Sequence, residues 1–141
     1  YVQREDEEAF QKALDCLVPF NQEWAHGAGA LVFILVRELF TYNDKPNAHA
    51  QYDTGQAAAQ LTMQAGSLGI FAHQMGGFKA EKVANAFSLP PGHRPLVAMA
   101  LGRLGSPDSL SESLRESEVA PRTRRALEEC LSDGKTCLKN N

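Results

Sequence analysis

The chain has few cysteines and no excess of basic charge, and both shortages limit what it can do. Its three cysteines, Cys16, Cys130 and Cys137, stand at unrelated spacings. We therefore expect no disulfide framework, and we expect a reducing, cytoplasmic setting. With 14 Lys and Arg against 17 Asp and Glu, the net charge is −3. This balance argues against nucleic acid as the main partner, because no basic excess exists to neutralise phosphates.

Long hydrophobic runs are also missing. The longest, residues 30–36, is far too short to cross a bilayer, and no charged-then-apolar signal segment opens the chain. We therefore expect no membrane as a partner. What is present, 141 residues of which 43% are hydrophobic, suffices for one ordinary globular domain. We expect this domain over residues 1–131, with residues 132–141 as a disordered tail.

The periodicity predicts three helices, at residues 6–17, 53–69 and 79–87. In the longest of them, Asp53 is expected to cap the N-terminus and Gly69 the C-terminus. Its predicted apolar stripe is Ala57, Leu61, Ala65 and Leu68. A second set of positions on this helix carries only small residues, namely Gly55, Ala59, Thr62 and Gly66. Small side chains would let another backbone or a flat group approach the helix. Tight packing within the chain explains the same pattern equally well.

Two continuous apolar segments, residues 30–36 and 95–105, are expected to be strands buried on both faces. A polar tract follows them, for which we expect a loop with a short helix. A basic cluster then leads into a helical segment at residues 121–131. Because helices and buried strands mix without a repeat, the class is α+β or α/β.

Common catalytic and metal-binding patterns are not found. The four histidines, His26, His49, His73 and His93, lie far apart, without a paired H-E-x-x-H or C-x-x-C motif, so no metal site is expected. No nucleophile-elbow motif is present either. Only the amino-acid composition would support a hydrolase that uses these histidines.

Two short features suit an anion. The pair Gly76-Gly77 precedes the helix predicted at residues 79–87, where backbone N–H groups would be exposed without obstruction by side chains. Arg122 and Arg124 stand two apart and can clamp a phosphate. Each feature alone is more often an ordinary turn or a solvated surface.

Taken together, residues 21–127 resemble the nitroreductase family of FMN-dependent oxidoreductases, in their middle and C-terminal portions. The matching segments follow the family's order: "NQEWAHGAGALVFIL", "AQYDTGQAAAQLTMQAGSLGI", "HQMGGF", "VANAFSLPPGHRPLVAMALG" and "APRTRRALEE". The resemblance implies an α+β fold with a central sheet flanked by helices. It also implies a homodimer with FMN at the interface, where the small residues of the long helix permit close approach.

The resemblance further implies a set of cofactor contacts but no catalytic side chain, because the flavin carries the chemistry. "HQMGGF" would contribute Gln74, Met75, Gly76 and Gly77 at the edge of the flavin ring, with the backbone N–H groups near N5 and O4 and with Gly77 as the stricter glycine. Arg122 and Arg124 would hold the FMN phosphate. Tyr42 and His73 are expected to line a pocket for the acceptor.

The implied reaction passes a hydride from NADH or NADPH through the flavin to a small-molecule acceptor, which is a nitroaromatic, a quinone or an enone. The family's opening Arg-Arg-Ser-type segment and its Asn-x-Gln-Pro-Trp-like stretch are not found, and the C-terminal residues also differ. We therefore expect an N-terminally truncated member with weakened flavin binding. The alternative is a non-catalytic family member that acts as a binding or dimerisation module.

Overall fold

The computed structural model describes residues 1–131. It divides into two compact units, Tyr1–Leu104 and Gly105–Asn141, of which the second is described to residue 131. Each unit is described by itself below. The tail predicted at residues 132–141 lies outside the described residues.

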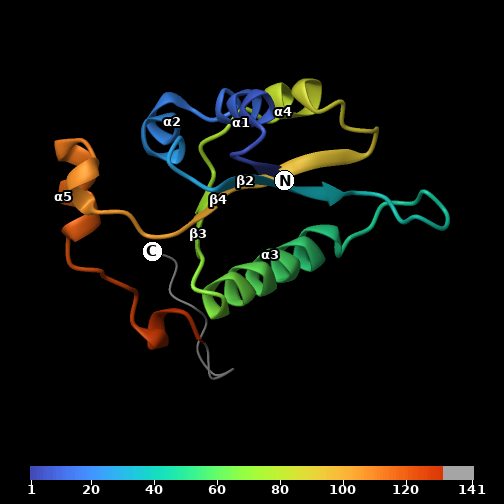
Figure 1. Ribbon diagram of the computed structural model, residues 1–141. Helices are drawn as coiled ribbons and strands as arrows, with labels where there is room; N and C mark the ends of the chain where they lie inside the picture. Colours follow the sequence, from blue (N-terminus) through green and yellow to red (C-terminus); the bar gives the residue numbers. More distant parts are fainter. Residues whose placement is uncertain (132–141) are drawn as a thin grey trace. The chain divides into compact units, whose positions relative to one another are not determined.

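The first unit contains a four-stranded antiparallel sheet in the order β1-β2-β4-β3 (Figure 1). Its strands are β1 (Val2–Gln3), β2 (Ala30–Arg37), β3 (Phe71–Met75) and β4 (His93–Gly102). The two strands predicted from continuous apolar runs, β2 and β4, are confirmed and pair with each other at the centre. The predicted burial on both faces is wrong for β2, in which only Leu31 and Val36 are buried and Leu35 is exposed. The edge strands β1 and β3 were not predicted.

Helices cover both faces of this sheet (Figure 1). On one face lie α1 (Glu7–Leu14), α2 (Pro19–Ala25) and α4 (Ala80–Ala86), and on the other lies α3 (Ala50–Ser67). The main core fills the space between the sheet and the first group, where apolar residues of α1 meet Leu31 of β2, Met75 of β3 and Ala98 of β4. The expected α+β class, a central sheet flanked by helices, is confirmed.

The ends of the long helix α3 illustrate one correct and one wrong prediction. Gly69 has a φ of +70° and follows the last helical turn, and the next residue, Ile70, donates from its N–H to the Ala65 carbonyl at 2.9 Å. This is the Schellman arrangement expected of a C-terminal glycine. The predicted N-terminal cap is wrong, because the helix begins at Ala50 and Asp53 already lies within its first turn.

The predicted inward stripe of α3 is also wrong in part. The helix buries Ala50, Ala58 and Ala65 against the sheet, whereas Ala57 and Leu68 are exposed. Both surfaces of α3 carry small residues, so the sequence pattern alone did not distinguish them. Of the predicted small-residue set, Gly55, Ala59 and Gly66 are exposed, whereas Thr62 is half-buried. We call the exposed outer surface of α3 the small-residue face; it consists of Gly55, Ala59 and Gly66 together with the larger Met63.

The second unit contains little regular structure in its described part. Its one α-helix, α5 (Glu112–Val119), confirms the short helix expected in the polar tract. A 3₁₀ turn at Pro107–Ser109 precedes it, and Asp108 pairs with Arg115 of α5 at 3.2 Å. The segment after the basic cluster forms only a 3₁₀ turn at Leu127–Glu129, shorter than the expected helical segment.

Candidate functional site

The Gly76-Gly77 pair forms a tight turn at the end of β3. The Phe78 N–H donates back to the Gly76 carbonyl at 3.0 Å. The Gly77 carbonyl accepts two hydrogen bonds, from the Val18 N–H at 3.1 Å and from Asn21 Nδ2 at 2.9 Å. Because Asn21 is the buried polar side chain of α2, this second bond fixes the turn to the helix layer.

The space around the two glycines differs sharply. A Cβ built on Gly77 would lie 2.5 Å from Asn21 Nδ2 and 2.9 Å from Val18 Cγ2, whereas one built on Gly76 meets nothing within 4 Å. Distances below 3.0 Å require a neighbour to move, and here one neighbour is held in place by its bond to the Gly77 carbonyl. Glycine is therefore needed at position 77 for packing within the chain.

The turn leaves backbone donors available. Within residues 1–131, neither the Gly76 nor the Gly77 N–H donates a hydrogen bond to the backbone or to a side chain. Gly76 is exposed and Gly77 is half-buried. Two adjacent N–H groups on a fixed turn suit an acceptor-bearing ligand edge or an anion, since their position does not have to be reorganised on binding.

The two residues before the turn point to opposite faces of the sheet. Gln74 is exposed on the α3 side, where its Nε2 donates to Thr62 Oγ1 at 3.2 Å. The Met75 side chain is 4% exposed and belongs to the core. Gln74 can therefore present a side chain to a ligand, whereas Met75 can offer only its backbone.

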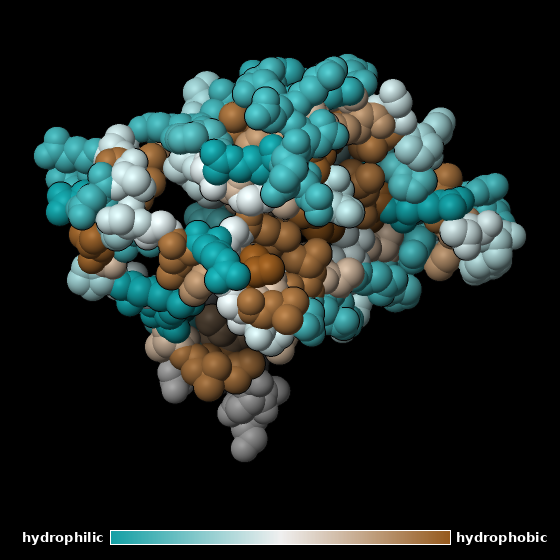
Figure 2. Space-filling model, viewed as in Figure 1, coloured by the Kyte–Doolittle hydropathy of each residue, from teal (hydrophilic) through white to brown (hydrophobic). Residues whose placement is uncertain are grey.

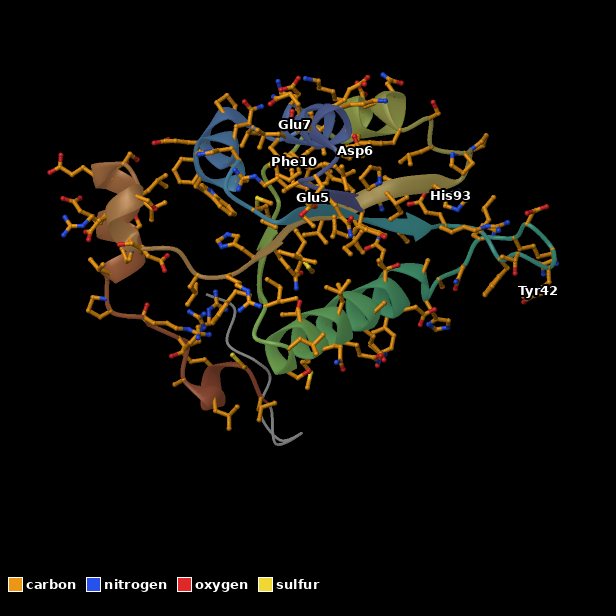
Figure 3. The ribbon with its side chains drawn as sticks, in the orientation of Figure 1. Glu5, Asp6, Glu7, Phe10, Tyr42 and His93 are labelled. Carbon is orange, nitrogen blue, oxygen red and sulfur yellow. The ribbon has the colours of Figure 1, made fainter. Side chains whose placement is uncertain are left out.

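The two residues expected in an acceptor pocket are not brought together. His73 lies on β3 and contacts Trp24 of α2, with ring centroids 4.6 Å apart and ring planes tilted by 57°. Tyr42 lies at the tip of the loop beyond β2, away from β3, and stacks on Phe40 at 5.2 Å (Figure 3). In the strand register, His73 aligns through Ala100 with the beginning of β2, whereas Tyr42 follows its end.

The predicted phosphate ligands belong to the second unit. Arg122 and Arg124 are both exposed, and Arg124 Nη1 donates to the Thr123 carbonyl at 2.7 Å. The guanidinium groups keep further donors for an anion. The structure describes these arginines and the Gly76-Gly77 turn within separate units.

Sequence reasoning missed the residues that support the site, namely Val18, Asn21, Trp24 and Thr62. Each contacts the β3 segment from a position more than ten residues away in the chain. Asn21 alone carries a local signal, since a short polar side chain in the first turn after Pro19 frequently has a structural hydrogen bond. The partner of that bond is set only by the tertiary fold.

In the part of the chain that the structure describes, the buried ionisable group is the Cys16 thiol. Burial is the largest effect on the Cys16 thiol and raises its pKa. The positive charges of Lys82 and Lys12 act to lower this pKa, and the negative charge of Asp15 acts to raise it. The thiol is fully buried and donates to the Lys12 carbonyl at 3.3 Å, so it stays protonated and serves as a core residue. Within residues 1–131, no group of three His, Cys, Asp or Glu side chains gathers as metal ligands, and none of the helices has the length and apolar character needed to span a membrane.

Comparison with known proteins identifies the family. The sequence model of the Nitroreductase family matches residues 2–103, which include the whole sheet and the Gly76-Gly77 turn. The chain belongs to the nitroreductase family. The resemblance drawn from the sequence motifs is thus confirmed.

Three individual proteins are similar to this chain. A 15.4 kDa protein of Mycolicibacterium smegmatis, described only by its position 5′ of ask, is 38% identical over 119 residues, which cover 84% of this chain and 79% of the relative. A solved oxidoreductase that contains FMN is 31% identical, with a TM-score of 0.88 over 96% of this chain and 69% of its own. A nitroreductase family protein of Streptococcus pneumoniae shares the fold at 13% identity, with a TM-score of 0.65 over 89% of this chain and 74% of its own.

Proposed function

We propose that this chain is the flavin-holding part of an FMN-dependent oxidoreductase. The observation that carries the proposal is the Gly76-Gly77 turn, which is fixed to α2 by Asn21 and whose two N–H groups have no hydrogen-bond acceptor among residues 1–131. The turn lies in a nitroreductase-family fold whose 31% identical relative contains FMN. Donors held in this way suit the polar edge of a flavin ring, because they favour the negative charge that reduction places there.

The other flavin contacts divide between the ring and the phosphate. Gln74 borders the ring through its exposed side chain, and Met75 contributes backbone only. Arg122 and Arg124 hold the phosphate, each charge-assisted hydrogen bond contributing about 1.5–3 kcal/mol. FMN held by these residues would supply hydride-transfer chemistry between NADH or NADPH and a nitroaromatic, quinone or enone acceptor.

His73 is our candidate for contact with the acceptor, because it is exposed on β3 three residues before Gly76. Its ring contacts Trp24 in a tilted arrangement, with the ring planes 57° apart, so either ring can offer a face or an edge to an aromatic acceptor. Tyr42 lies too far along the sheet to join this surface in the same chain. We propose that it contacts an acceptor only if the second subunit brings it there.

We also propose that the working form is a homodimer, in the cytoplasm. The small-residue face of α3 is open in the single chain, since a Cβ on Gly55 or Gly66 would meet nothing within 4 Å. Figure 2 shows exposed hydrophobic atoms among polar ones on the side of the molecule that it draws. On α3 itself, Met63 is 76% exposed. A second copy would cover these atoms and allow close helix packing.

The test is a visible absorption spectrum of the purified protein after FMN is added and unbound flavin is removed. We expect the protein to retain a flavin absorption band at ~450 nm. Addition of NADH or NADPH should bleach this band, because it reduces the flavin. Arg124→Ala should lose the band, whereas Arg103→Ala, which removes the same charge from an exposed position of the first unit, should keep it. A colourless protein after every loading attempt would contradict the proposal and favour a non-catalytic binding or dimerisation module.

A further inference from the structure

The side-chain amide of Gln74 has a fixed orientation, because the hydroxyl of Thr62 can take only one role toward it. Thr62 Oγ1 donates its hydrogen to the Ala58 carbonyl, one turn earlier in α3, at 2.9 Å. A hydroxyl has a single hydrogen and two acceptor lone pairs, so Thr62 has only acceptor capacity left for Gln74. The Gln74 atom that lies 3.2 Å from Thr62 Oγ1 is therefore the donor Nε2, and the acceptor Oε1 is left for another partner.

The amide held in this way offers an acceptor beside a donor. Among residues 1–131, no group donates a hydrogen bond to Gln74 Oε1, and Thr62 accepts from Nε2, which carries two hydrogens. Gln74 is exposed, whereas Thr62 is half-buried, so the amide is the part that a ligand reaches. An acceptor and a donor side by side on one amide suit a ring edge that carries the complementary pair, as when glutamine contacts the edge of a base.

The neighbouring Gly76-Gly77 turn can supply donors only. Its N–H groups suit the carbonyl oxygens of a flavin, but the flavin ring also has an imide N–H between two carbonyl groups. A donor that is buried without an acceptor costs binding free energy. Gln74 stands two residues before Gly76, near the end of β3, and its Oε1 supplies the acceptor that the turn lacks. A nitro group or a quinone carries no such donor, so Oε1 suits the flavin rather than the oxidising substrate.

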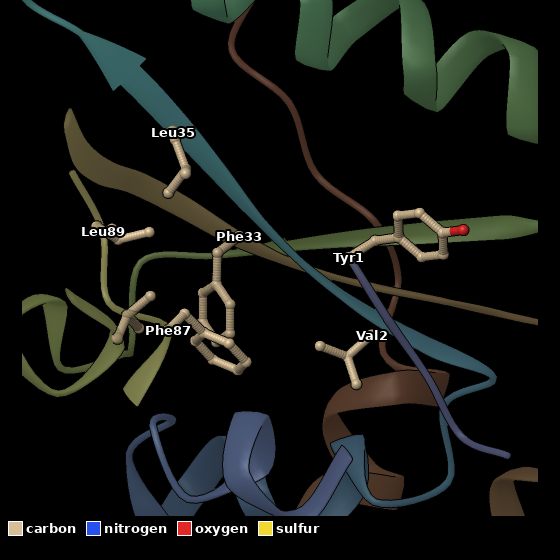
Figure 4. Close-up of a pocket in the computed structure, with 7 residues that line it drawn as sticks. Tyr1, Val2, Phe33, Leu35, Phe87 and Leu89 are labelled. Atoms are coloured by element: carbon tan, nitrogen blue, oxygen red, sulfur yellow. The ribbon is translucent and has the colours of Figure 1, made fainter. Parts of the chain in front are cut away.

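An apolar pocket of about 140 Å³ on the other face of the sheet does not provide this contact. Its wall includes Phe33 and Leu35 of β2, Val83 of α4 and Phe87 after it (Figure 4), and none of these side chains forms hydrogen bonds. Recognition of an imide therefore falls to the α3 side, where the Gln74 amide lies.

Building on the flavin site proposed above, we propose that Thr62 is a positioning residue for the flavin. It does not touch the ring; it holds the Gln74 amide so that Oε1 accepts a hydrogen bond from the imide N–H. The site thereby selects a flavin whose imide is unsubstituted. Without the Thr62 hydroxyl, the amide can turn over and face the imide with Nε2, which sets two donors against each other.

The first experiment compares two ligands on the purified chain, FMN and 3-methyl-FMN, in which a methyl group replaces the imide hydrogen. Fluorescence titration should show FMN bound about tenfold more tightly, because the methylated ring leaves Oε1 without its donor. Equal affinity for the two flavins overturns the role of Thr62 and leaves the proposed function in place. A chain that binds neither flavin overturns both.

Variants of two threonines on α3 show whether the preference depends on positioning. Thr62→Val keeps the shape of the side chain without its hydroxyl, and it should lower the preference for FMN over 3-methyl-FMN by about threefold. Thr62→Ser retains a hydroxyl and should keep the preference. Thr54→Val is the matched control, because Thr54 is also half-buried and donates to the Ala50 carbonyl at 2.7 Å, without a bond to Gln74. The proposal fails if Thr62→Val keeps the full preference or if Thr54→Val lowers it equally.

The free protein provides a readout that needs no flavin. In the ¹⁵N-labelled chain, the side-chain amide hydrogens of Gln74 should exchange with water faster in Thr62→Val than in Thr62→Ser or Thr54→Val, because only the first variant loses the acceptor of Nε2. Equal exchange in the three variants would show that Thr62 does not hold the amide, and it would overturn the proposal whatever the flavin affinities are.

Discussion

Gly77 is the residue on which the geometry of the candidate site depends. Gly77→Ala should destabilise the fold by about 1–3 kcal/mol, because the new Cβ overlaps Asn21 and Val18 in a region with little room. Gly76→Ala is the matched control and should change stability by no more than about 0.5 kcal/mol. Urea unfolding of the three proteins measures both effects, and equal stabilities would show that the turn can relax.

Gly76 allows the backbone donor itself to be tested. Gly76→Pro removes one N–H that we assign to the flavin, whereas Gly76→Ala keeps it and meets no neighbour. The proline variant should therefore bind FMN more weakly by about 1–3 kcal/mol, the cost of losing a hydrogen bond to a buried acceptor. Fluorescence titration with FMN measures the affinities, and urea unfolding shows whether each variant is folded. Equal affinity of the proline and alanine variants would remove Gly76 from the flavin site.

At the scale of elements, the end of α3 provides a paired test of helix stability. Gly69 has a φ of +70°, and Gly69→Ala should cost about 1–2 kcal/mol because an L-residue is strained there. Gly66 lies inside the same helix with open space around it, so Gly66→Ala should instead stabilise the protein by about 0.5–1 kcal/mol. Chemical unfolding should give changes of opposite sign, and a common sign would contradict the Schellman end.

The elements that the sequence predicted well are those with strong local signals. β2 and β4 are continuous apolar runs, and α1 has an acidic first turn preceded by the N-cap Asp6, which accepts a hydrogen bond from the Ala9 N–H. β3 was missed because its residues include the polar His73 and Gln74, so it has no strand pattern of its own. It exists because β4 offers a paired edge over five residues, and such tertiary context overrides weak local preference.

The candidate site also depends on tertiary contacts that the local sequence does not reveal. The motif "HQMGGF" located the turn from sequence, and the greater strictness of Gly77, expected only by analogy, now has a physical cause in Asn21 and Val18. Neither of those residues has a local signal that links it to Gly77, since Asn21 lies 56 positions away in the chain. For Tyr42 and His73, the family likeness suggested one pocket, but strand register separates them within a chain. Contacts of this kind follow from topology rather than from spacing.

For the whole molecule, the proposed function requires surfaces that one copy leaves open. The turn that we propose for the flavin ring follows an edge strand of the first unit, and the arginines that we propose for the phosphate belong to the second unit. The small-residue face of α3 adds an exposed surface that includes Met63. A second subunit would cover this face and exclude water from the ring, which strengthens the hydrogen bonds that hold it. Flavin binding and dimerisation should therefore depend on each other.

This dependence gives the last prediction. Met63→Lys places a charge in the small-residue face, and burying it should cost at least about 2 kcal/mol per subunit, enough to shift a dimer toward monomers. Phe20→Lys is the control, because Phe20 is also exposed but lies on α2, across the sheet from α3. Sedimentation velocity with and without FMN should show the Met63→Lys protein as a monomer with weakened flavin binding and the Phe20→Lys protein as a flavin-bound dimer. A Met63→Lys dimer that retains FMN would place the subunit interface elsewhere, and a monomer that retains FMN would separate flavin binding from dimerisation.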